Sequence, residues 1–476
     1  MKLVYYGTLH NPIKLIGINL LEGSRLRTFQ ASPVKWAAAL LLSSSILFSQ
    51  SAAFAASPAT ATAAADGAAQ YKQYLKEELS VELSGTVTKG DFIEAVADAL
   101  GYEPSGEEVA FTDLQSDDPL YNAAAALYEK GILSGPAVSG DQVLTASVAV
   151  LIAVRAADLK ELAYTYPASK VDKALAKLKV SSAALGAKGA QEVAAAVDAG
   201  LIPAELYAGF KPNGAAGDEL IHTLLGKVLV TKGLYKKYLG YVSDADIYSK
   251  LSAAYEASDI IEAPKLQELV NTALKQELVT GYSLKDSRFD PRFIDSLSLT
   301  YGHSDLKHAI QLIGLLRSEG IDAKVQFEPK TSAFIFLAEW GEPGPNVVQI
   351  ENGNYINYDK EYDISFEFAS AKDKAAFDRI VLAYAKKNEE NQAGLIYGSW
   401  WQPLYFTTTA LTDYEEITNN FIVDPNSPYT VNTFSLNEDS AKVVEGLKAI
   451  DPDAAIHPYA IWADQPFFRY LNGESA

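Results

Sequence analysis

The residue types best suited to catalysis or metal binding are sparse in this sequence. Its 476 residues include no cysteine, which excludes thiol nucleophiles, disulfides and zinc–thiolate sites. His303 and His308 are five residues apart, and on one helix their side chains would point about 140° apart, which does not suit a single metal ion. His222 and His457 are isolated in the sequence. We therefore expect structural histidines, no metal site and no cofactor.

Aromatic residues near the C-terminus offer a second kind of chemistry, the stacking of side chains on sugar rings. Trp400, Trp401 and Tyr405 form one cluster beside a proline, and residues 462–470 form another. Aromatic side chains on strands near proline more often pack in a core or at a sheet edge. Packing is the favoured interpretation, and glycan stacking is the alternative. Carboxylates are numerous, but no pair can be assigned the separation that a glycosidase needs, so we assign no catalytic residue.

A third pattern combines a hydroxyl, a cation and a carboxylate at predicted helix starts. Thr88, Lys89, Gly90 and Asp91 are consecutive, and Thr145 precedes another helical stretch. A threonine hydroxyl can cap a helix by accepting a backbone N–H bond, and an acid three residues later resembles a capping box. The pattern predicts helices that begin directly after Thr88 and Thr145.

These helices belong to a degenerate repeat with a constant order of parts. A helix ends at glycine, a short apolar and aromatic loop follows, and a capped helix starts. Gly131, Gly200 and Gly281 stand where this order requires a left-handed or crowded backbone. Short helix pairs of this kind bury little surface alone, so neighbouring units must stack on one another.

At these residues the chain resembles the S-layer homology module, a family that anchors exported proteins to the Gram-positive cell wall. The closest stretch runs from Phe111-Thr-Asp-Leu to Ala157 and includes Tyr128-Glu-Lys-Gly-Ile-Leu-Ser-Gly. The resemblance covers residues 81–160 well and 190–300 weakly. It implies three repeats in a pseudo-threefold helical bundle, whose grooves bind pyruvylated secondary cell-wall polysaccharide through the basic residue of a Thr-Arg-Ala-Glu motif.

The positions of that motif are unevenly kept. Residues 88–91 (Thr-Lys-Gly-Asp) keep a cation and a carboxylate, residues 145–148 (Thr-Ala-Ser-Val) keep only the threonine, and residues 217–219 (Gly-Asp-Glu) keep only the acid. A pyruvyl ketal is an anion, so a groove without its cation loses a charge-assisted hydrogen bond of roughly 1.5–3 kcal/mol. The resemblance supports the fold more strongly than the affinity. It implies polymer contacts at Thr88, Lys89, Asp91 and Thr145.

A weaker resemblance covers about 35 residues from Tyr301 onward. The run Leu315-Leu-Arg, followed by Gly320-Ile-Asp-Ala, looks like the end of the nucleophile helix of transglutaminase-like proteins. It puts Asp305 in the place of the catalytic cysteine and Ser332 near that of the histidine. Neither can form a thiolate–imidazole pair, so the resemblance implies an inactive copy. An unrelated helix–glycine–strand unit explains the pattern equally well.

Residues 1–55 are predicted to be a cleavable secretory signal. Arg25, Arg27 and Lys35 precede an apolar run over 36–48, and Ala53-Phe-Ala fits the small-residue cleavage rule. The run is shorter than the roughly 20 apolar residues of a membrane-spanning helix. An uncleaved anchor is therefore the less favoured alternative.

The charge of the chain argues against several classes of partner. The formal net charge is −20, and residues 1–55 contain five Lys or Arg and one Glu, so their removal leaves −24. A field of that sign repels nucleic acids and anionic lipids. We expect no nucleic-acid partner and, after signal cleavage, no membrane partner.

Composition and periodicity divide the rest of the chain into three parts. Residues 56–75 are small and polar and are predicted to be a flexible linker. Residues 76–300 repeat apolar side chains at helical spacing and are predicted to be an all-α repeat region. Residues 301–476 add strand-like runs and are predicted to be a separate α+β domain, so that the chain is α+β overall. Those runs are Ala323–Glu328, Ala333–Leu337 and Asp363–Phe368, with helices predicted at Ala371–Lys387 and Ser440–Ile450.

The function that these observations predict is that of a secreted, non-catalytic protein at the cell wall or S-layer surface. Its helical region would bind secondary cell-wall polysaccharide and display the C-terminal domain. One alternative is a secreted carbohydrate-active or transglutaminase-fold enzyme. Another is a receptor for a substrate or peptide, which would need a deep cleft near residue 300.

Overall fold

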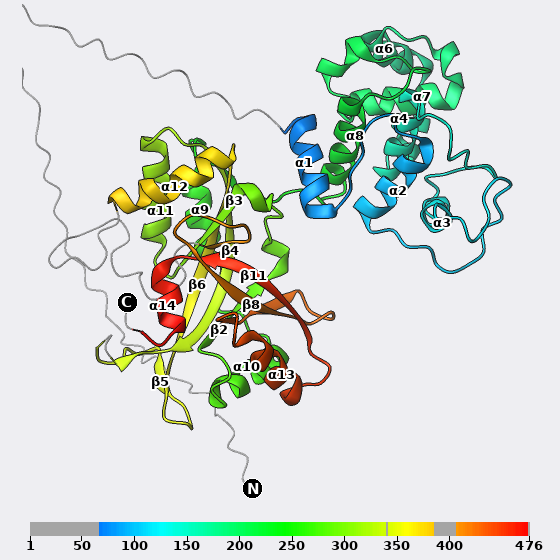
Figure 1. Cartoon of the computed structure of the whole chain (residues 1–476). Coiled ribbons are helices and arrows are strands. Elements are labelled where there is room, and N and C mark those ends of the chain that lie inside the picture. The colour runs from blue at the N-terminus through cyan, green and yellow to red at the C-terminus, as the bar shows by residue number, and fades with distance from the viewer. Residues whose placement is uncertain (1–65, 339–340, 385–405, 475–476) are drawn as a thin grey trace, which may run out of the picture. The chain divides into compact units, whose positions relative to one another are not determined.

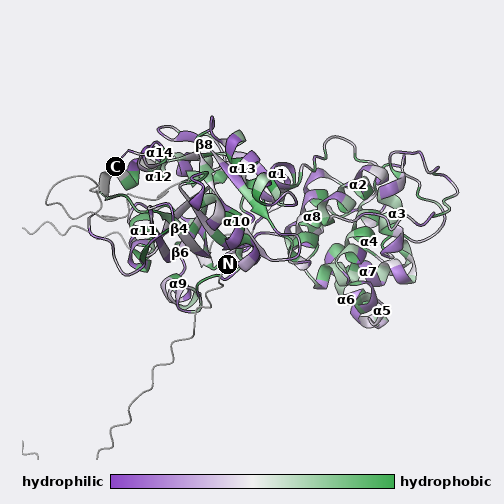
Figure 2. Cartoon of the chain, turned by 90° about the horizontal axis from the view of Figure 1, so that it is seen from below, coloured by the Kyte–Doolittle hydropathy of each residue, from purple (hydrophilic) through white to green (hydrophobic). Residues whose placement is uncertain are grey.

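The computed structural model describes residues 66–338, 341–384 and 406–474, so the predicted signal lies outside the described residues. The first part of the described chain forms helices joined by loops and 3-10 turns (Figure 1). These helices are α1 (Ala68–Leu79), α2 (Lys89–Leu100), α3 (Tyr121–Glu129), α4 (Ala146–Ala156), α5 (Lys160–Tyr164), α6 (Ala168–Leu178), α7 (Gly186–Asp198) and α8 (Asp218–Thr231). Hydrophobic and hydrophilic residues alternate along them in short stretches (Figure 2), as expected for helices with one buried face.

Three of these helices start side by side. Thr88, before α2, pairs with Val143, and Thr145, before α4, pairs with Ala215 in the segment that leads to α8. The backbone of Leu144 joins both pairs, because its N–H donates to the carbonyl of Val87 and its carbonyl accepts from Ala216. Helices α2, α4 and α8 also contact one another pairwise and share one apolar core. The backbone pairing that joins the start of α2 to the start of α4 is therefore repeated between the starts of α4 and α8.

The predicted caps of α2 and α4 are confirmed. The Thr88 hydroxyl accepts a hydrogen bond from the N–H of Asp91 at 3.1 Å, and the Asp91 carboxylate accepts one from the N–H of Thr88 at 2.7 Å. The Thr145 hydroxyl accepts from the N–H of Val148 at 3.3 Å. Each cap satisfies backbone donors that the first turn of a helix leaves without a partner.

The special backbone predicted at helix ends is confirmed at two of the three glycines. Gly131 and Gly200 have φ values of +69° and +74°, in the left-handed region. Gly281 lies instead in a strand, where an added Cβ would come within 2.8 Å of the carbonyl oxygen of Ala333. Two of the positions require a left-handed turn and the third requires close approach of another strand.

Helix α1 corrects the linker predicted over residues 56–75. Residues 68–75 are helical, and Tyr71, Tyr74 and Leu75 are buried on one face of α1, which contacts α8. The short apolar stripe follows a long run of small residues, so it did not stand out from the predicted linker. Its spacing of three and four residues is nevertheless typical of an amphipathic helix.

From residue 240 onward the chain forms a sheet that closes into a barrel. Eight antiparallel strands follow one another in the order β4, β2, β9, β8, β11, β7, β3 and β6, and β6 pairs with β4 to complete the ring. They are β2 (Gly281–Asp286), β3 (Ser298–His303), β4 (Ala323–Ile335), β6 (Tyr355–Phe368), β7 (Phe406–Thr407), β8 (Glu415–Val423), β9 (Tyr429–Asn432) and β11 (Ala455–Ala463). Three short strands, β1 (Gly240–Tyr241), β5 (Val347–Gln349) and β10 (Phe434–Ser435), pair with β4, β6 and β8.

Helices cover the outer face of this barrel. They are α9 (Ile247–Glu256), α10 (Pro264–Lys275), α11 (Leu306–Ser318), α12 (Ala371–Tyr384) and α13 (Ser440–Ile450). A further helix, α14 (Gln465–Leu471), packs Phe467 and Tyr470 against Ile417 of β8 and Ile461 of β11. Tyr362, Ile364 and Phe366 of β6 share a buried apolar cluster with residues of α9, α11 and α12, and β2 and β9 share another with α10 and α13. No helix among the described residues is long and apolar enough to cross a membrane.

The barrel corrects the predicted fold class, an all-α region to residue 300 followed by a separate α+β domain. Strands β1, β2 and β3 arise in the stretch predicted to be helical, and the predicted division at residues 300 and 301 falls inside β3. The physical reason is that these strands are short and are stabilised by distant partners. Strand β2, for example, is held between β4 and β9, and β9 begins at Tyr429. The runs predicted over 323–328 and 363–368 lie in β4 and β6, and α12 and α13 start where helices were predicted.

Candidate functional site

A small cavity lies beside the first turn of α2. Its volume is about 140 Å³. It is lined by the start of α2, by the segment between α2 and α3, by the loop between α3 and α4, and by one face of α4: Lys89, Phe111, Leu133, Ser134, Gly135, Ala137, Val138, Val148, Leu151, Ile152 and Arg155. The charged residues of this lining are both basic and most others are apolar, although the chain carries a net charge of −20. We call this cavity the Lys89 pocket.

Lys89 supplies the cation that is available to a ligand. Its ammonium makes no hydrogen bond or ion pair with the described residues. Burial lowers the pKa of Lys89, and the charge of Arg155 adds to this effect, while the Asp113 carboxylate opposes it. An ammonium that is partly removed from water attracts an anion more strongly than a fully solvated one, because the local dielectric constant is lower.

Arg155 shapes the wall of the pocket. Its guanidinium donates to the Glu192 carboxylate at 2.9 and 3.1 Å, to the carbonyl of Ile132 at 3.2 Å and to the Ser134 hydroxyl at 3.3 Å. The Glu192 side chain is buried and also accepts a bond from the Tyr164 hydroxyl at 2.8 Å. The charge of Arg155 is thus compensated internally, and its donors fix the turn over residues 132–134.

The aspartate of the Phe111-Thr-Asp-Leu phrase holds the opposite end of the same loop. The carboxylate of Asp113 accepts hydrogen bonds from the N–H groups of Val138 and Ser139 at 2.8 and 2.7 Å. These backbone bonds lower the pKa of Asp113, which keeps the acceptor charged. The phrase that carries the family resemblance therefore serves to close the loop around the Lys89 pocket.

The four residues predicted to contact a polymer are not brought together by the structure. Lys89 lines the basic pocket, whereas Thr88 and Asp91 line a neighbouring cavity of about 460 Å³ that also contains the side chains of Glu94, Asp118 and Asp141. Thr145 lines neither cavity. In the described residues, no group of three or more His, Asp or Glu is placed to bind a metal ion.

The three equivalent helix starts differ in charge. Lys89 follows the cap of α2, and Ala146, which is buried, follows the cap of α4. Asp218 begins α8, and its carboxylate pairs with the Lys72 ammonium at 2.7 Å. Of these three positions, the first alone can attract an anion.

Sequence reasoning did not identify Arg155, although a signal was present. Val148, Leu151, Ile152 and Arg155 follow the spacing of one helical face, so an arginine at the end of this otherwise apolar face could have been assigned to a pocket wall. Its partner Glu192 lies on α7, and no local pattern links the two.

The interior of the barrel is a second concentration of polar groups, and sequence reasoning did not identify it. The Lys330 ammonium lies 2.8 Å from the Asp363 carboxylate and 3.2 Å from that of Glu361. The Lys285 ammonium lies 2.9 Å from Asp363 and 3.0 Å from Glu328. Burial raises the pKa values of Glu328 and Glu361, whereas the two ammonium groups outweigh burial and lower the pKa of Asp363.

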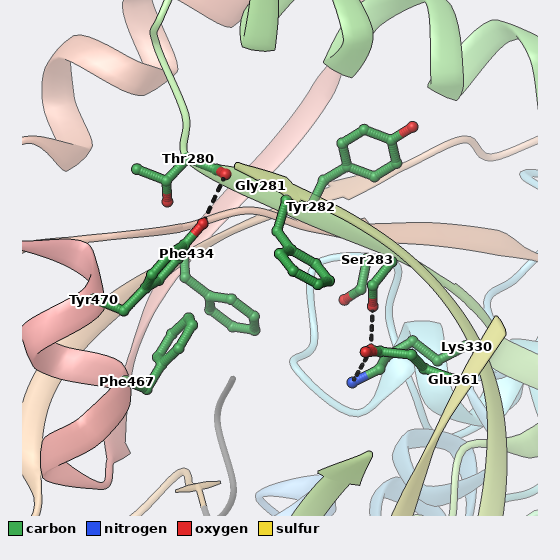
Figure 3. A pocket seen from close by; sticks show the side chains of 11 residues that line it. Thr280, Gly281, Tyr282, Ser283, Lys330, Glu361, Phe434, Phe467 and Tyr470 are labelled. Atoms are coloured by element: carbon green, nitrogen blue, oxygen red, sulfur yellow. Dashed lines mark hydrogen bonds and ion pairs between the residues drawn. The ribbon is translucent and has the colours of Figure 1, made fainter. Parts of the chain in front are cut away.

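Two cavities adjoin this ionic network. The larger, of about 400 Å³, is lined by barrel residues that include Lys285, Thr300, Glu328 and Tyr459. It is a cavity near residue 300, the region where a receptor would need one. The smaller, of about 50 Å³, is lined by Lys330 and Glu361 and by aromatic rings (Figure 3). An eight-stranded barrel has room for interior side chains or for one small ligand.

The two residues matched to a transglutaminase pair lie on different sides of the barrel wall. The Asp305 carboxylate accepts the N–H of Lys307 at 2.9 Å and caps α11, which packs on the outer face. The Ser332 hydroxyl donates to Glu361 at 2.5 Å and lines the smaller interior cavity. They form no catalytic constellation with each other.

The assumption that His303 and His308 share one helix is wrong. His303 ends β3 and His308 lies in α11, and their Nε2 and Nδ1 atoms are 3.1 Å apart. The N–H of Asp305 donates to Nδ1 of His303 at 2.7 Å, which leaves Nε2 as the protonated nitrogen that donates to His308. Burial, with the nearby His308, lowers the pKa of His303 to about 3. The pair is neutral and links β3 to α11.

Trp400, Trp401 and Tyr405, the candidates for glycan stacking, lie outside the described residues. No protein-family model and no curated protein sequence matches this chain. The site therefore has to be interpreted from its own chemistry.

Proposed function

We propose that this chain is a secreted, non-catalytic protein that attaches to an anionic polysaccharide of the cell wall through the Lys89 pocket. The polymer is secondary cell-wall polysaccharide, with a pyruvyl ketal as the group that is recognised. The observation that carries the proposal is the Lys89 ammonium, which is partly buried and makes no ion pair with described residues. It stands at the position of the basic residue in the motif that the chain resembles.

The size and lining of the pocket fit one substituent of a polymer. Its volume of about 140 Å³ is smaller than the roughly 300–1,000 Å³ of pockets that enclose whole small ligands. The carboxylate of a ketal would accept a hydrogen bond from Lys89, and its methyl group would contact Leu133 and Val148 on the apolar wall. The rest of the sugar chain would remain outside.

The proposal assigns different roles to the residues of the motif. Lys89 binds the anion, while Thr88 and Asp91 position it by capping α2. The helix starts at Ala146 and Asp218 contribute no cation, so one binding groove per chain is expected. The acidic cavity beside Asp91 repels the polymer and favours one orientation.

The test is retention of the chain, without residues 1–55, on purified pyruvylated wall polysaccharide. We expect Lys89→Gln to weaken binding by roughly 10- to 150-fold, the equivalent of one charge-assisted hydrogen bond. Lys177→Gln is the matched control, because Lys177 lies in the same helical region but forms an exposed ion pair with Asp198. Chemical removal of the pyruvyl groups should reduce binding to the level of the Lys89 variant.

Two outcomes would contradict the proposal. One is equal retention of the wild type and the Lys89→Gln variant, when both have the same thermal unfolding midpoint. The other is undiminished binding to polymer without pyruvyl groups.

A further inference from the structure

The smaller cavity of the barrel combines aromatic rings with one carboxylate. Figure 3 shows Phe434, Phe467 and Tyr470 together on one side and Ser283, Lys330 and Glu361 on the other. The rings of Phe467 and Phe434 are 5.5 Å apart in an edge-to-face arrangement, and those of Phe467 and Tyr470 are 5.9 Å apart. The volume of about 50 Å³ exceeds the roughly 10–15 Å³ that one water needs, and it suits a head group of a few heavy atoms.

The Glu361 carboxylate is only half satisfied within the protein. One oxygen, Oε2, accepts the Ser332 hydroxyl at 2.5 Å and pairs with Lys330 at 3.2 Å. The other oxygen, Oε1, is buried and has no hydrogen-bond partner among the described residues. The residue is 1% exposed, so bulk water does not supply the missing bond. A buried acceptor without a donor costs about 1–3 kcal/mol.

The ionic network around Glu361 holds more carboxylates than ammonium groups. Lys285 and Lys330 are shared by three carboxylates, those of Glu328, Glu361 and Asp363. Each oxygen of Asp363 pairs with one lysine. Glu328 is bonded through one oxygen to Lys285 and through the other to the Ser365 hydroxyl. Glu361 therefore has the unused oxygen, in a network that holds one more carboxylate than ammonium group.

We propose that this pocket binds the ammonium head group of a small amine. An N–H of the ligand donates to Glu361 Oε1, and the carbons next to its nitrogen lie against Phe434, Phe467 and Tyr470. A cation completes the charge balance of the network, and aromatic faces attract ammonium groups by roughly 0.5–2 kcal/mol. The carboxylate disfavours anions. The site is independent of the proposed wall attachment, because its residues belong to the barrel.

The test is calorimetric titration of the chain without residues 1–55, together with its thermal unfolding, using methyl-, ethyl- and propylammonium chloride at pH 8. Sodium chloride at the same ionic strength is the reference. We expect saturable binding of at least one of these amines and a rise in the unfolding midpoint that sodium does not cause. Glu361→Gln should weaken binding at least tenfold, because the amide keeps the shape and loses the charge.

Glu328→Gln is the matched control. It makes the same change of charge in the same network, but both oxygens of Glu328 have partners and its side chain lines the larger cavity. The variant removes the excess charge and keeps the acceptor, so it should weaken binding less than Glu361→Gln does. Phe467→Leu keeps the carboxylate and removes one aromatic ring, and it should weaken amine binding severalfold. This variant provides the test if the Glu361→Gln protein does not fold. The proposal would be overturned if the amines bound no more strongly than sodium and raised the unfolding midpoint no further. In that case a proton or a water molecule would satisfy Oε1. An undiminished response in the Glu361→Gln and Phe467→Leu variants would also overturn the proposal.

Discussion

Single residues in this protein acquire their roles from partners that are distant in the sequence. Lys89 was identified from its neighbours along the chain, because the motif around it is contiguous. Arg155 was not identified, because the acid that neutralises it lies on another helix. Glu361 was not identified either, because the lysine and serine that bond to it lie on β4. A sequence shows that a residue can be charged, but it does not show which charges surround it.

His303 gives a prediction at this scale. Between pH 7 and pH 5 an unfolded imidazole, with a pKa near 6.5, takes up a proton. Folded His303, with its pKa lowered to about 3, does not. The folded state therefore loses stability as the pH falls below about 6.5, by about 2 kcal/mol at pH 5 for this group.

Urea unfolding at both pH values measures this loss. The wild type should lose about 2 kcal/mol more than the His303→Gln variant, from the pKa difference of His303 alone. His308, whose pKa burial also lowers, contributes to the loss in both proteins. Equal losses would show that His303 is not a buried, neutral base.

At the scale of elements, the helix caps could be predicted from local signals, whereas the short helix α1 and the strand pairings were not predicted. The starts of α2 and α4 could be predicted because a capping threonine acts within three residues of its own position. The alternation on β6 was also visible, with Tyr362, Ile364 and Phe366 on one face. Alternation does not show whether the polar face of a strand is exposed to solvent or lines the inside of a barrel. Here Glu361 and Asp363 meet two lysines.

The cap of α2 gives a prediction at this scale. Thr88→Ala removes the hydroxyl that accepts the N–H of Asp91, and should lower the free energy of unfolding by about 1 kcal/mol. Thr88→Ser keeps the hydroxyl and should restore most of that loss. Urea unfolding of both variants measures this difference. An unchanged free energy of unfolding in Thr88→Ala would mean that the capping box adds nothing to stability.

At the scale of the whole molecule, the division of the chain was the least predictable property. Residues 60–476 form one compact unit, and the barrel draws β2 and β3 from before residue 304. Strand β2 is only six residues long, so periodicity carries little information about it. Its place in the barrel is set by pairing with β4 and β9, which no single-sequence pattern encodes.

A truncation gives the prediction at this scale. A fragment of residues 301–476 lacks β2 and half of β3, so two of the eight strands of the ring are missing or incomplete. We expect no cooperative urea unfolding and no near-ultraviolet circular dichroism from this fragment. A fragment of residues 60–476 should show both. Cooperative unfolding of the shorter fragment would mean that the ring is not needed for stability.

The position of β11 has a consequence for the order of folding. This strand lies between β8 and β7 in the ring and pairs with both, yet it ends at Ala463, close to the end of the chain. The barrel cannot close until the chain has been synthesised as far as β11, which takes tens of seconds at about 5–20 residues per second. Pairing between segments as far apart in the sequence as β2 and β9 is slow as well. The ring is therefore expected to stay open until β11 has been made and has inserted between β8 and β7.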